Sequence, residues 1–168
     1  LTAEQMRKEM GQTVIVENVG GAAGALGTAQ GAKAAPDGYT LTVATVSTMI
    51  VYSATRSSPK YTLESFAPIT NIASMPNVLT VNASFPAKNL TEFIKILKDN
   101  PGKYTFASSG IGSINHMLGE SFQAEAGVKM VHVPYKGSGP AMQDVMGGQV
   151  NSLFDQFPSS KPYIDGGK

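Results

Sequence analysis

The chain has 168 residues, of which 42% are hydrophobic and 15% charged, and this suits one folded domain or two small lobes. The formal net charge is +1, so we expect no binding of nucleic acid and no basic face for a membrane surface. The absence of cysteine excludes disulfides and thiolate metal sites. No apolar run approaches the roughly 20 residues of a transmembrane helix.

The N-terminal segment predicts a helix, a strand and a glycine-rich loop. A helix is predicted over residues 1–10, because its apolar residues share one side and Gly11 is a natural stop. The β-branched run at residues 13–16 predicts a buried strand. The small residues from 20 to 27 predict a loop that opens a helix, which ends near residue 34.

Three further strands are predicted before the chain reaches its midpoint. They are expected over residues 39–45, 66–73 and 77–81, and a polar loop is expected at residues 46–48. A helix follows over residues 90–98, where the apolar residues share one face.

The second half of the chain repeats one strand–loop–helix unit. Strands are predicted over residues 104–107, 130–133 and 150–154, and the helices that follow them over residues 114–126, 140–146 and 161–164. This alternation predicts an α/β fold with a parallel sheet. Ligands in such folds bind beyond the carboxyl ends of the strands, where the predicted loops lie.

The loop Ser108, Ser109, Gly110, Ile111, Gly112, Ser113 is the most informative stretch, because it follows a strand and opens a helix. Free amides in the first turn of a helix, together with the helix dipole, attract an anion. The serine hydroxyls would add donors. The alternative interpretation is a tight connection in which Ser113 caps the helix.

Two other loops are predicted at the same edge of the sheet. Lys136 follows Tyr135 in a glycine-rich loop and could balance a carboxylate, or it could simply be solvated. Asp155 is expected in the loop after a strand, where its carboxylate could contact a ligand or cap the next helix.

Other chemistry finds little support in the sequence. A triad of Ser109, His116 and Asp155 can be imagined, but neither serine lies in the Gly-x-Ser-x-Gly pattern of hydrolases. His116 and His132 lack the spacing of a metal-binding pair. Residues 20–24 do not meet the dinucleotide fingerprint, so close helix–sheet packing is the favoured interpretation. We therefore expect no catalysis, no metal and no cofactor.

Six short motifs resemble, in order and spacing, those of the Bug family, the extracytoplasmic solute receptors of tripartite tricarboxylate transporters. The resemblance extends from about Met10 to Lys168. The motifs lie at residues 36–41, 66–69, 76–79, 107–113, 132–137 and 147–150.

The resemblance implies a periplasmic-binding-protein-like fold of type II, with two lobes, mostly parallel sheets and a cleft between the lobes. It implies a periplasmic receptor that is not an enzyme and that delivers its ligand to membrane transporter subunits. The expected ligand is a small organic acid: a dicarboxylate or tricarboxylate, an acidic amino acid or an aromatic carboxylate. The lobes would close over it by hinge motion.

By this likeness, the loop after Ala107 and Asp155 lie on the second lobe's side of the cleft, and residues 45–47 face them from the first lobe. With the loops found above, the predicted ligand-binding residues are Thr45, Ser47, Ser108, Ser109, Gly110, Gly112, Ser113, His116, Tyr135, Lys136 and Asp155.

The predicted division is a partial first lobe at residues 1–75 and a second lobe at residues 76–168, with a hinge crossing near residues 74–82. Family members are longer, so we expect more of the first lobe, and a signal peptide, outside this chain. Two alternatives remain at this point. One is a serine-type hydrolase that uses the triad above. The other is a truncated, non-binding remnant that self-associates through exposed sheet edges.

Overall fold

A computed structural model describes residues 2–167, and within them one four-stranded sheet occupies the C-terminal part of the chain. Its order is β1-β4-β2-β3. The strands are β1 (Asn77–Val81), β2 (Thr105–Ser108), β3 (Val131–Pro134) and β4 (Ser152–Gln156). β2 pairs in parallel with β3 and β4, whereas β1 pairs with β4 in antiparallel fashion. The predicted α/β fold with a mostly parallel sheet is therefore confirmed.

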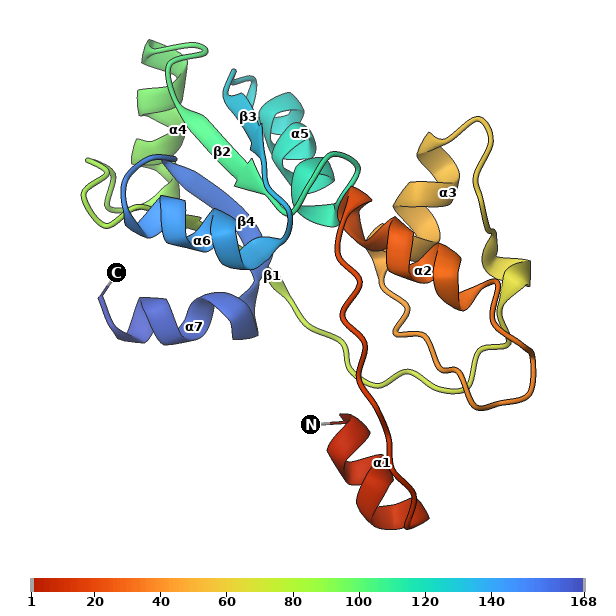
Figure 1. Ribbon diagram of the computed structural model, residues 1–168. Helices are drawn as coiled ribbons and strands as arrows, with labels where there is room; N and C mark the ends of the chain where they lie inside the picture. Colours follow the sequence, from red (N-terminus) through yellow and green to blue (C-terminus); the bar gives the residue numbers. More distant parts are fainter. Residues whose placement is uncertain (1, 168) are drawn as a thin grey trace.

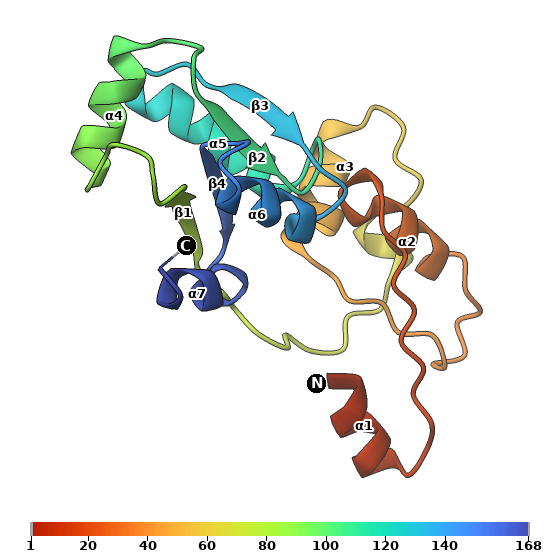
Figure 2. The same cartoon turned by 60° about the vertical axis from the view of Figure 1, so that its left-hand side comes forward.

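Helices cover both faces of this sheet, as Figures 1 and 2 show. They are α4 (Leu90–Asp99), α5 (Ile114–Ala126), α6 (Ser138–Met146) and α7 (Phe157–Asp165). Side chains alternate between the faces of a strand. Phe106 and Phe154 accordingly pack with α4 and α5 in one core, whereas Ala107 and Leu153 pack with α6 in another. The predicted helices of this half are confirmed. α5 spans the predicted residues, whereas α6 begins two residues and α7 four residues earlier than predicted.

The last strand lies two residues further along the chain than predicted. Residues 150–154 were the expected strand, but β4 runs from Ser152 to Gln156, and Asp155 pairs with Val78 of β1. The prediction that Asp155 lies in a loop is therefore wrong. Pairing with β1 extends the strand past the apolar run on which the prediction rested.

The N-terminal part contains helices and a small core of its own. The elements are α1 (Thr2–Met10), η1 (Ala22–Gly24), α2 (Ala25–Gly31), η2 (Ser47–Val51), α3 (Tyr52–Thr55) and η3 (Leu63–Ser65). Its core contains Ala25, Ala29, Met49 and Tyr61. The predicted loop at residues 46–48 is wrong, because Thr45 Oγ1 accepts a hydrogen bond from the main-chain N–H of Thr48 and so begins a helical turn.

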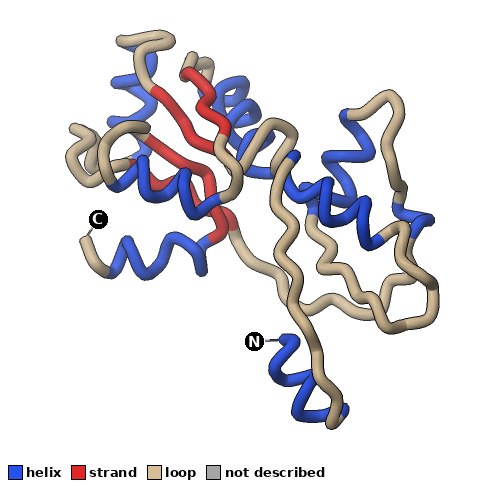
Figure 3. Tube along the Cα trace, viewed as in Figure 1, coloured by secondary structure: helices blue, strands red, loops and turns tan. Residues whose placement is uncertain are grey.

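The strands predicted at residues 13–16, 39–45 and 66–73 are absent from the described structure, and Figure 3 shows all three segments as loops. Their apolar side chains are largely exposed, for example Ile15 at 80% and Ile69 at 78%. A β-branched run fits a pleated, half-buried surface, but it becomes a strand only when another strand pairs with it. None of the described residues provides that partner.

The predicted lobe boundary between residues 75 and 76 and the hinge near residues 74–82 stay predictions. No helix among residues 2–167 is long and apolar enough to span a membrane.

Candidate functional site

A hollow of about 520 Å³ lies where the N-terminal part meets the carboxyl ends of β2 and β3. One wall is formed by residues 20–24 and Arg56, and the other by residues 109–111 and 134–137. In Figure 1 the loop after β2 meets the start of η1 at this point. The hollow therefore lies at the carboxyl edge of the sheet, where the sequence predicts the ligand-binding loops.

Gly110 brings the loop after β2 close to Ala23 on the opposite wall. A Cβ added there would lie 3.4 Å from the main-chain nitrogen of Ala23 and 3.4 Å from the carbonyl oxygen of Tyr135. Its φ of +136° is also a conformation that side chains rarely adopt. Glycine is therefore favoured here by conformation, whereas a Cβ would make only ordinary van der Waals contacts.

The opposite wall contains backbone in an unusual conformation. Ala22 and Ala23 both have positive φ, at 48° and 56°. Each such residue costs about 1–2 kcal/mol unless its surroundings impose the conformation. The sequence favoured simple helix–sheet packing for residues 20–24. The structure places them at the hollow, where strained backbone is a common feature of functional sites.

The prediction that the amides at the start of α5 are unpaired is largely wrong. The hydroxyl of Ser108 accepts from the N–H of Gly110, and Ser47 Oγ accepts from the N–H of Ile114 at 2.9 Å. Other protein atoms accept from the amides of Gly112, Ser113 and His116. Across residues 109–116, the amides left without a partner in the described structure are those of Ser109, Ile111 and Asn115.

Ser109 and Ile111 nevertheless line the hollow, so two amides remain beside it. Ser113 is fully buried, and its Oγ accepts from the N–H of His116, which is the capping role weighed as the alternative. Ser47 contributes its hydroxyl to α5 rather than to open space.

Asn115 joins three elements beneath the hollow. Its Oδ1 accepts from Ser109 Oγ at 2.7 Å, and its Nδ2 donates to the carbonyl of Phe154 and to Asp155 Oδ1. Asp155 is 2% exposed, and its Oδ1 also accepts from Ser138 Oγ. Asp155 Oδ2 has no partner in the described structure. This network connects the serine on the wall to the buried carboxylate.

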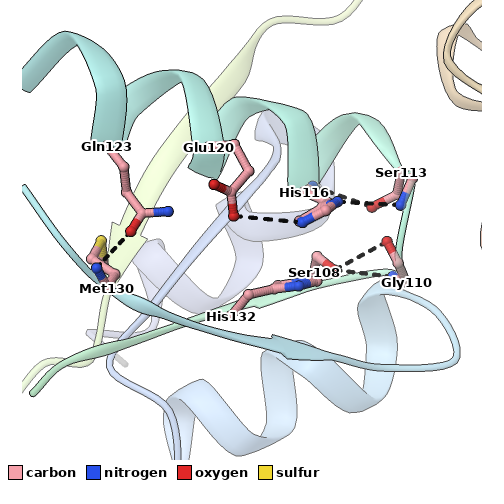
Figure 4. Close-up of polar contacts among 9 residues, drawn as sticks. Ser108, Gly110, Ser113, His116, Glu120, Gln123, Met130 and His132 are labelled. Atoms are coloured by element: carbon pink, nitrogen blue, oxygen red, sulfur yellow. Dashed lines mark hydrogen bonds and ion pairs between the residues drawn. The ribbon is translucent and has the colours of Figure 1, made fainter. Parts of the chain in front are cut away.

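Two histidines hold the other side of the same loop (Figure 4). His116 Nδ1 accepts from the N–H of Gly112 at 3.3 Å, and a hydrogen bond of 2.6 Å joins His132 Nε2 to Ser108 Oγ. His116 Nε2 lies 3.5 Å from Glu120 Oε1. His116 therefore contacts the predicted loop but is not among the residues that line the hollow.

The charged side chains on the walls are both cationic. Arg56 and Lys136 are exposed, and neither forms an ion pair within residues 2–167. Tyr135 instead donates its hydroxyl to Asp144 Oδ2, and burial together with this carboxylate raises the pKa of Tyr135 to about 12. Tyr135 therefore stays neutral, and the hollow carries a positive potential.

The imagined catalytic triad is not assembled. Ser109 bonds Asn115, His116 bonds Gly112, and Asp155 bonds Asn115 and Ser138, so no hydrogen bond joins two of its members. Thr45 is exposed, and in the described structure its hydroxyl bonds Thr48 while its carbonyl accepts from the N–H of Met49 and from the Thr48 hydroxyl.

Sequence reasoning missed Arg56, Asn115 and the loop 20–24. Arg56 follows a helix of only four residues and belongs to no motif. Asn115 gave no signal, because its partners on β4 lie about 40 residues further along the chain. The glycines of residues 20–24 are conspicuous in the sequence, but their spacing favours helix–sheet packing over a site.

Comparison with known proteins identifies the family. Residues 1–168 match the model of the tripartite tricarboxylate transporter family receptor. The chain belongs to this family. The resemblance to Bug receptors in the sequence is thereby confirmed. BugT of Bordetella pertussis is 36% identical over 167 residues, covering 98% of this chain and 51% of BugT.

Solved structures of receptors show the same architecture. A periplasmic transporter is 50% identical with a TM-score of 0.96, covering 98% of this chain and 56% of that one. MatC from Rhodopseudomonas palustris, solved with bound malate, is 31% identical with a TM-score of 0.91, again covering 98% and 56%. The chain spans about half the length of the curated relatives that it matches.

Proposed function

We propose that this chain is the part of a periplasmic solute receptor that captures a small organic carboxylate and presents it to a tripartite transporter. The observation that carries the proposal is the 520 Å³ hollow, whose charged side chains, Arg56 and Lys136, are both cationic. The receptor does not transform its ligand. The alternative of hydrolysis loses its basis because the serine, histidine and aspartate bond other partners.

Three further features support a carboxylate as the ligand. Within residues 2–167 the amides of Ser109 and Ile111 have no acceptor, and two donors suit the two oxygens of a carboxylate. The hollow is bounded by glycine backbone, which a ligand can approach closely. MatC, a relative with the same fold, was solved with malate.

We further propose that the two walls belong to the two lobes, residues 1–75 and 76–168, and that they close over the ligand about a hinge near residues 74–82. Contacts such as the one between Ser47 and Ile114 would then form and break with closure. Thr45, Gly112 and Asp155 act in this proposal as supports of the walls.

A thermal-shift screen tests carboxylate binding. Malate at about 100 times its Kd is expected to stabilise the fold by about 2.7 kcal/mol, which raises Tm by roughly 5–10 °C. Malamide, which has the same carbon skeleton but no charge, is the control and is expected to leave Tm unchanged. Equal shifts with malate and malamide, or none with any organic acid, would refute the proposal.

Neutralising the cations is expected to weaken binding. Arg56→Gln and Lys136→Gln should each raise the Kd for malate about fivefold, since a partly exposed charge pair contributes about 1 kcal/mol. Lys129→Gln removes an exposed charge outside the hollow and is the matched control. Isothermal titration calorimetry measures all three. An equal Kd for Lys129→Gln and the two hollow variants would mean that net charge, not the site, drives binding.

A further inference from the structure

Two histidines from different elements stack on one another beside the hollow. The rings of His116 on α5 and His132 on β3 lie 4.0 Å apart between centroids and are inclined by 19°. The ring of Phe106 on β2 lies beside both histidines, 4.9 Å from the ring of His132 and 6.5 Å from that of His116. Phe106 is fully buried, so the stack has a fixed base.

Both rings contact the loop of residues 108–113, which follows β2, as Figure 4 shows. His116 Nδ1 accepts from the N–H of Gly112, and His132 Nε2 bonds Ser108 Oγ. Ser108 Oγ in turn accepts from the N–H of Gly110 at 3.1 Å. The pair therefore fixes both glycines of the loop, one directly and one through a serine.

The surroundings of the pair contain few charges. From α5, Glu120 faces His116 at 3.5 Å and is half exposed. From β2, the neutral Phe106 and Ser108 face His132. The start of α5 adds the positive end of the helix dipole. Glu120 is thus the one acidic group that forms an ion-pair contact with the pair in the described part of the chain.

We infer that the stacked His116–His132 pair positions the loop of residues 108–113, and that protonating His132 loosens this loop and weakens ligand capture. The second half of the inference rests on the proposed function, because residues 109–111 form one wall of the hollow. A protonated His132 carries its charge in a half-buried position, 4.0 Å from the ring of His116 that accepts from Gly112, so the charge disturbs the contacts of the pair with the loop.

The direction of the pH effect follows from His132. Burial, and secondarily the charge of His116, lowers its pKa from 6.5 to about 4. A histidine released into water binds a proton near pH 6.5, so the released loop binds protons more tightly than the formed loop. The formed loop therefore has its full stability above pH 6.5 and loses it as the pH falls toward about 4.

An NMR titration of the ligand-free chain tests the positioning role. With isotope-labelled glycine and histidine, the amide resonances of Gly110 and Gly112 are expected to move with the ring resonances of His132 as the pH falls from about 7.5 toward about 4. Gly127, at the opposite end of α5, is the reference and is expected not to move. Stationary Gly110 and Gly112 resonances while the ring of His132 titrates would overturn the inference.

The effect on ligand capture is measured with malate. His132→Gln keeps a hydrogen-bonding group but cannot titrate. Between about pH 7.5 and pH 5, affinity of the unaltered chain is expected to fall about tenfold further than that of the variant. Comparing the two proteins cancels the ionisation of malate itself. Lys129→Gln, an exposed change next to β3, should follow the unaltered chain.

Equal pH dependence in the unaltered chain and His132→Gln would overturn the regulatory half of the inference. Failure of malate to bind at any pH would contradict the proposed function and that half together. The glycine titration needs no ligand and no variant, so it decides the positioning role in every case.

Discussion

Replacing Gly119 by alanine is expected to destabilise the fold by about 2–3 kcal/mol, although alanine favours helices by about 1 kcal/mol over glycine. Gly119 is buried in α5, and a Cβ there would lie 2.1 Å from Cε2 of Phe106. Phe106 cannot move aside easily, because its ring is fully buried and packs edge-on against Phe154. Urea unfolding followed by circular dichroism measures the loss.

Ser121→Ala is the matched control for this prediction, since Ser121 is exposed on the same helix. It is expected to change the free energy of unfolding by less than about 0.5 kcal/mol. Unchanged stability in Gly119→Ala would show that Phe106 has room to turn, and the histidine stack above it would then be less rigid than described.

Asn115→Ala is expected to cost about 3 kcal/mol or more. The change removes a donor from buried Asp155 and from the carbonyl of Phe154, and an acceptor from Ser109. A buried polar group left without its partner costs about 1–3 kcal/mol, and a charged group costs more. The same change should weaken malate binding, because Ser109 lines the hollow.

A double-mutant cycle with Asp155→Asn separates the network from simple loss of packing. Part of the cost of Asn115→Ala comes from the carboxylate that loses its donor. The loss of stability caused by Asn115→Ala should therefore be smaller by at least about 1 kcal/mol in a background that carries Asp155→Asn. Purely additive effects would show that Asn115 stabilises the fold without regard to the charge of Asp155.

The second half of the chain could be predicted because its signals are local. Helix α5 is predicted by Ser113, which caps it, and by apolar residues such as Phe122 at helical spacing. The strands of this half have partners within the same half, so apolar runs became strands. Asp155 was misplaced by the two-residue extension of β4, which pairing with β1 causes.

The first half was predicted less well because strand formation depends on a partner. Residues 13–16 and 39–45 have strand-like sequences, yet within the described structure they pair with nothing. The same limit applied to the site. The position of the loop after β2 is predicted correctly from the sequence, but the hydrogen-bond partners of its amides are not. The acceptor for the Ile114 amide is Ser47, which lies 67 residues earlier in the chain.

The internal hydrogen bonds of the glycine loop have a kinetic consequence. A loop whose glycines are already held by Ser108 and His116 needs no internal rearrangement when an acid arrives, so encounter should be fast and similar for all acids of equal charge. Discrimination among acids would then reside in how quickly each one escapes. Residence time, rather than arrival, would distinguish the preferred solute from its competitors.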